Sequence, residues 1–98
     1  MSFVKISNYR NRIADVEYEI NKEQNKIFSL EDNLKQRHKD KEFTLQNKIK
    51  WLPTFQLGIE QAELQIKIHE AIKDKLINEL KFLRLELQEA LDEKNKSS

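Results

Sequence analysis

The stretch KWLPTFQLGIE, residues 50–60, contains the only proline and the only glycine of a 98-residue chain. Proline has no amide hydrogen to donate, and it disfavours a helical backbone at the residue before it. The stretch therefore predicts that one long helix ends near Leu52 and that a second begins after a turn. We expect a first helix at about 6–52, a turn at 53–58 with Thr54 or Gly58 capping the next helix, a second helix at 59–93 and a frayed polar tail at 94–98.

On the N-terminal side of this stretch, apolar residues recur in steps of three and four, which is the heptad spacing of a helix that packs along one stripe. Glu23 interrupts the series once, and the phase slips by four after Leu34, through His38. Such a stutter locally unwinds a supercoil. The predicted stripe consists of Ile6, Tyr9, Ile13, Val16, Ile20, Ile27, Leu30, Leu34, Leu45, Ile49 and Leu52.

The C-terminal side repeats the pattern. Its stripe consists of Ile59, Ala62, Ile66, His69, Lys73, Leu76, Leu80, Leu83, Leu87 and Ala90. Two such stripes joined by a turn predict an all-α fold, a long antiparallel two-helix coiled-coil hairpin that forms a single domain and dimerises into a four-helix bundle. An alternative is that residues 50–60 act as a hinge for a domain swap.

The turn position also predicts which residues face each other. In an antiparallel pair the numbers of facing residues add to a constant, and a turn centred on Phe55 sets that constant near 110. Leu34 would then face Leu76, and Leu30 would face Leu80. In this register Lys41 faces His69 and Arg37 faces Lys73, which predicts a hydrated polar midsection that sets the register or acts as a hinge or contact site.

Composition narrows the class of protein. A charged fraction of 36% with an apolar fraction of 38% is typical of long amphipathic helices. Eighteen basic residues against 17 acidic ones leave almost no net field to attract nucleic acid or membrane. The abundance of Lys, Asn and Ile suits AT-rich coding, as in a low-GC bacterium, its phage or an AT-rich parasite.

Targeting signals are missing from the sequence. The N-terminus lacks the apolar core of a signal peptide, and no run approaches the ~18 apolar residues of a membrane span. We therefore expect a soluble protein of the cytoplasm.

The second helix carries more apolar residues than one neighbouring helix can cover. A helix that is apolar on most sides is normally buried by several neighbours. This excess predicts a non-enzymatic protein–protein interaction module, such as an adaptor, chaperone, scaffold or small inhibitor, and a homodimer. The candidate interface residues are Ile72, Ile77, Phe82, Leu85, Leu91, Phe28, Trp51, Phe55 and Leu57.

Two simpler explanations compete with an interface. Scattered exposed apolar residues are normal on protein surfaces. The residues of the turn, including Trp51 and Phe55, could instead fold over the end of the helix pair and seal it.

A basic stretch supports an alternative function. Residues 35–42, KQRHKDKE, continue into further lysines, and such a face could bind phosphates of a nucleic acid without sequence specificity. Interspersed acidic residues and the lack of interleaved aromatics favour a solvated helix face instead. The candidate phosphate contacts are Lys35, Arg37, Lys39, Lys41, Lys48 and Lys50.

Catalytic, metal and cofactor motifs are not visible. The chain has no cysteine, hence no disulfide, no thiolate metal site and no thiol nucleophile. Neither His38 nor His69 has the glutamate three residues earlier that carboxylate-bridged metal sites in helical bundles use. Glycine-rich phosphate loops and zinc motifs are missing as well. We therefore expect no enzyme activity, no cofactor and no metal.

Overall fold

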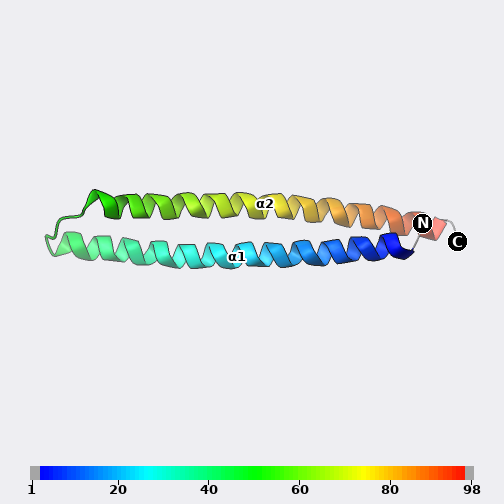
Figure 1. Ribbon diagram of the computed structural model, residues 1–98, viewed down its shortest axis with the longest axis horizontal. Helices are drawn as coiled ribbons and strands as arrows, with labels where there is room; N and C mark the ends of the chain where they lie inside the picture. The colour runs from blue at the N-terminus through cyan, green and yellow to red at the C-terminus, as the bar shows by residue number, and fades with distance from the viewer. Residues whose placement is uncertain (1–2, 97–98) are drawn as a thin grey trace. The chain divides into compact units, whose positions relative to one another are not determined.

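The computed structural model describes the backbone of residues 3–96 and the side chains of residues 5–96. It contains two α-helices, α1 at Phe3–Gln46 and α2 at Pro53–Lys96, joined by a short loop at residues 47–52 (Figure 1). No strand occurs between residues 3 and 96, so the predicted all-α helical hairpin is confirmed. No helix in this range is sufficiently long and apolar to cross a membrane.

The predicted helix ends are wrong by six residues at the loop, because α1 ends at Gln46 rather than near Leu52. A set of backbone hydrogen bonds ends it. The Ile49 N–H donates to the Thr44 carbonyl (2.9 Å), and the Lys48 N–H donates to the Leu45 carbonyl (3.2 Å). Lys48 has a φ of 56°, so these bonds form a Schellman motif, in which a left-handed residue closes the helix. The chain thus leaves the helix well before the proline.

Pro53 begins α2 instead of ending α1. At the first position of a helix the missing amide hydrogen of proline has no intrahelical partner to lose, and its fixed φ suits the helix. The Leu52 carbonyl accepts hydrogen bonds from the N–H groups of Phe55 (3.0 Å) and Gln56 (3.3 Å). Leu52 is therefore the N-cap residue, and the predicted caps Thr54 and Gly58 lie inside α2.

Gly58 has a packing role rather than a turn role. A Cβ atom at this position would lie 2.6 Å from Nη1 of Arg37, which is closer than side chains approach each other. The bare backbone therefore lets the guanidinium of α1 lie against α2. The tail predicted at 94–98 is helical up to Lys96, and residues 97–98 lie outside the described part of the chain.

The chain divides into two compact units. Unit 1 combines Met1–Lys22 with Ile72–Ser98, and unit 2 is Glu23–Ala71, which includes the loop. Within each unit a segment of α1 packs against a segment of α2. The single domain of the sequence analysis stays a prediction.

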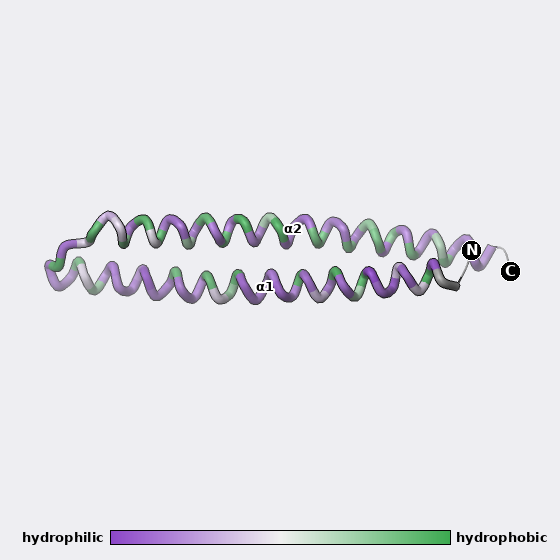
Figure 2. The backbone as a smooth tube through the Cα atoms, in the orientation of Figure 1, coloured by the Kyte–Doolittle hydropathy of each residue, from purple (hydrophilic) through white to green (hydrophobic). Residues whose placement is uncertain are grey.

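The buried apolar residues all come from the predicted stripes, which confirms that periodicity identified the packed faces. Figure 2 shows apolar residues recurring among hydrophilic ones along both helices. In unit 1 the buried apolar residues are Ile6, Val16, Leu80 and Ala90, and in unit 2 they are Ile27, Ile59 and Ala62.

The predicted register is wrong. In unit 1, Tyr9 hydrogen-bonds Glu86, and in unit 2 Glu23 contacts His69. The residue numbers in such pairs add to between 91 and 101, instead of 110. The shift is about two heptads, which preserves each stripe but changes every partner. In the observed register the last residues of the first predicted stripe are exposed instead of packed. These residues are Leu45, Ile49 and Leu52.

The left-handed residue of the loop yields a first test. A lysine in this conformation is strained by about 1 kcal/mol relative to glycine, so Lys48→Gly should raise the free energy of unfolding by about 0.5–1 kcal/mol. Urea unfolding monitored by circular dichroism measures it. Lys50→Gly, in the same loop but without a positive φ, is the matched control and should bring no gain. Equal effects at both positions would contradict the role of Lys48 as the left-handed residue that closes α1.

The glycine inside α2 yields a second test. Alanine is favoured over glycine in a helix by about 0.8–1 kcal/mol, and the clashing atom is the mobile end of an arginine. Gly58→Ala should therefore stabilise the protein by up to about 1 kcal/mol, as measured by thermal or urea unfolding. The same change in an Arg37→Ala background should stabilise at least as much. A clear loss of stability with Arg37 present would show that the guanidinium cannot move aside.

Candidate functional site

The structure leaves most of the predicted interface residues exposed. In unit 1, Phe82, Leu85 and Ile72 are exposed, while Ile77 and Leu91 are half-buried. In unit 2 the exposed members are Phe28, Phe55 and Leu57, and Trp51 is half-buried. Whether these residues bind a partner stays a prediction.

A stripe of exposed apolar residues runs along α2 in unit 2, and we call it the outer stripe. Its members follow one another by seven, four and three residues, which places them on one side of the helix. The buried residues Ile59 and Ala62 lie on the opposite side of α2, which faces α1. The outer stripe consists of Leu57, Leu64, Ile68 and Ala71.

Only Leu57 of these four was among the predicted site residues. The signal for the others was present in the sequence, because a second series with three- and four-residue steps runs beside the packed one. In unit 1 the corresponding side of α2 carries Phe82 and Leu85, both exposed.

A cluster of four side chains braces the loop in unit 2. The Gln56 Oε1 atom accepts hydrogen bonds from Lys41 Nζ (2.9 Å) and from Trp51 Nε1 (3.1 Å). Lys41 Nζ also lies 5.8 Å from the centre of the Trp51 ring, which is a cation–π distance. The Trp51 and Phe55 rings pack at 5.2 Å with a 53° tilt. The cluster ties α1, the loop and α2 together, so Trp51 has a structural role.

Other apolar side chains near the loop have no such cover. They lie where the helix pair ends and no longer provides a facing surface. The exposed members are Phe43, Leu45, Ile49, Leu52 and Leu57.

The polar midsection is built differently from the prediction. Lys41 contacts Gln56 instead of His69. The partner of His69 is Glu23, whose residue is only 7% exposed, and Nδ1 of the histidine lies 2.6 Å from Oε2 of the glutamate. Lys26 Nζ lies 3.3 Å from the other carboxylate oxygen of Glu23. The predicted pairing of Lys41 with His69 was wrong because it depended on the wrong register.

The hydrogen bond from His69 lowers the pKa of Glu23 below its ordinary value. Burial acts in the opposite direction, and Lys26 adds to the lowering. The side chain of Glu23 is therefore held as a carboxylate between two donors. A buried carboxylate with this many partners is a structural feature of unit 2 and needs no ligand to explain it.

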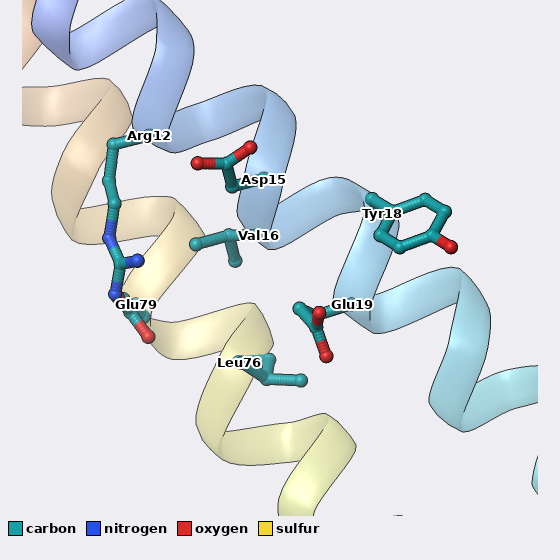
Figure 3. A pocket seen from close by; sticks show the side chains of 7 residues that line it. All are labelled: Arg12, Asp15, Val16, Tyr18, Glu19, Leu76 and Glu79. Carbon is teal, nitrogen blue, oxygen red and sulfur yellow. The ribbon is translucent and has the colours of Figure 1, made fainter.

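A groove with a volume of about 400 Å³ lies in unit 1. Val16 and Leu76 lie between the two helices there, and Arg12 reaches across to form an ion pair with Glu79 (Figure 3). Tyr18 also lines this groove, and its ring lies apart from the Arg12–Glu79 pair. Within the described residues, the charged groups of this groove are already paired, apart from Asp15.

The candidate phosphate contacts lie in unit 2. Lys41 is occupied by the loop cluster, and Arg37 donates through Nε to Asn33 (2.8 Å). Four others are exposed: Lys35, Lys39, Lys48 and Lys50. Within the described residues, no group of three or more His, Cys, Asp or Glu side chains is arranged to hold a metal ion.

Comparisons of the chain with models of protein families, with curated proteins and with solved structures give no significant match.

The buried carboxylate makes stability depend on pH. A folded-state pKa below the ordinary value of about 4.3 means that this contribution is present above that pH and is lost as the pH falls through the lowered pKa. Glu23→Gln should lose about 1 kcal/mol at pH 6, and this loss should shrink as the pH falls through the lowered pKa of Glu23. Urea unfolding of both proteins across this range measures the difference. A difference that stays constant with pH would contradict the role of the carboxylate, and Glu19→Gln, exposed on α1, is the control.

Proposed function

We propose that this chain is a non-enzymatic protein-binding module that presents apolar surface on a helical hairpin. The observation that carries the proposal is the balance of buried and exposed apolar side chains. Among residues 5–96, thirteen large apolar side chains are 38–64% exposed, whereas only five are buried. Single exposed apolar residues are ordinary, but contiguous apolar surface on a protein marks an interaction site.

The outer stripe of unit 2 is the main binding surface in this proposal. Helices that bind helices do so through residues spaced by three, four and seven, and Leu57, Leu64 and Ile68 have this spacing. These side chains come from within a regular helix, so their positions are set before binding. Preorganised surfaces lose less entropy when they bind.

The apolar residues around the loop form a second surface in the same proposal. Phe55 is held by its contact with Trp51, and Leu57 connects this surface to the outer stripe. The role of an adaptor, chaperone, scaffold or small inhibitor is compatible with both surfaces. A location in the cytoplasm belongs to the proposal as well and is supported by the sequence alone.

Nucleic-acid binding has less support. Lys41 is used inside the protein, and Trp51, which could stack on a base, is occupied by Lys41 and Phe55.

The proposal is tested by photo-cross-linking in cells that express the protein. A photoreactive phenylalanine analogue at Ile68 should form discrete covalent adducts with protein, while the same analogue at Asn25, an exposed polar position of α1 in the same unit, should form none. Gel mobility and mass spectrometry identify the adducts. A failure to form protein adducts from Ile68, Phe82 and Phe55 alike would contradict a protein-binding function.

A further inference from the structure

We infer that the outer stripe binds a second copy of this chain, with the two α2 helices antiparallel. The inference rests on the proposed protein-binding function and identifies its partner. Surface of unit 2 in one copy would meet surface of unit 1 in the other, and the reverse contact would form at the same time. This exchange is the isologous arrangement of a two-fold dimer.

Charge complementarity carries the inference. Four charged residues follow one another at seven-residue intervals beside the apolar residues of α2. Glu60 and Lys67 flank the outer stripe in unit 2, and Asp74 and Lys81 flank the apolar residues of unit 1. All four side chains are exposed, and none of them has an ion pair or hydrogen bond within the described residues. Their charges alternate, negative, positive, negative, positive.

This alternation matches an antiparallel copy. When one sequence is read forwards and the other backwards, Glu60 faces Lys81 and Lys67 faces Asp74. The two-fold symmetry repeats both pairs, so all four contacts are between opposite charges. A parallel copy in register would place each residue level with its own counterpart, and like charges would meet. Flanking charges of this kind set the orientation of coiled coils.

The same alignment brings apolar side chains together. With Glu60 level with Lys81, Phe82 of the other copy lies two residues from the level of Leu57, and Ala71 lies two residues from the level of Ile68. Two residues are about 3 Å along a helix, so both pairs come within contact. Lys75 lies two residues from the level of Leu64, and its aliphatic stem can cover Leu64 while the ammonium group reaches water. The two-fold symmetry forms each of the pairs Leu57–Phe82 and Ile68–Ala71 twice. Four layers of exposed apolar side chains are therefore buried in the dimer.

A set of charge reversals tests the inference by sedimentation equilibrium of the full chain. The unchanged protein should dimerise. Glu60→Lys alone places lysine against Lys81, and Lys81→Glu alone places glutamate against Glu60, so each variant should dimerise about tenfold to a hundredfold more weakly. Circular dichroism checks that both remain helical.

Recombining the charges should restore the dimer. An equimolar mixture of the two single variants should form a heterodimer, and the double variant Glu60→Lys/Lys81→Glu should form a homodimer, both near the original affinity. Lys39→Glu, an exposed charge on α1, should leave the affinity unchanged. Ile68→Glu should abolish the dimer, because it places a charge in an apolar layer.

Two results would overturn the inference. One is a protein that stays monomeric up to millimolar concentration. The other is a dimer whose affinity does not respond to Glu60→Lys and Lys81→Glu, or responds without recovery in the mixture. If the protein is monomeric and the cross-link from Ile68 reaches a different protein, the second-copy inference fails while the protein-binding function stands. If no cross-link forms to any protein, the function itself fails.

Discussion

The whole arrangement depends on where the chain reverses direction. Lys48 adopts a left-handed backbone, and the hydrogen bonds from Ile49 to Thr44 and from Lys48 to Leu45 close α1 at that point. In a two-helix hairpin, the position of the reversal determines which residues of the two helices face each other. It therefore decides which apolar side chains are buried and which remain available for a partner.

The stripes could be predicted from the sequence, but the register could not. Three- and four-residue spacing reports the face of a helix, and every buried apolar residue belongs to the predicted faces. The same spacing is compatible with registers that differ by whole heptads, so only the turn could choose between them. Pro53 led to the wrong register because a proline can follow the end of one helix or begin the next. Lysine in a left-handed conformation leaves no pattern that would have corrected it.

The errors in the site follow from this single displacement. Glu23 was visible as a polar interruption of the first stripe, but its contact with His69 could not be found without the correct register. Leu45, Ile49 and Leu52 were assigned to the packed face, yet they are exposed because α2 does not extend beside them. The exposure of the outer residues of α2 was easier to predict, since it depends only on which side of the helix a residue occupies and not on the register. Phe82 and Leu85 are exposed as an interface would require.

The register itself is the claim to test first, and double electron–electron resonance between spin labels in unit 2 tests it directly. The chain has no cysteine to remove before labelling. Asn33 and Gln61 line one groove, so labels there should be separated by little more than the ~10 Å between packed helices. Labels at Asp40 and Glu70 should be displaced by about 22 Å along the helices, which is fifteen residues at about 1.5 Å each. A short distance between Asp40 and Glu70, with a long one between Asn33 and Gln61, would contradict the account.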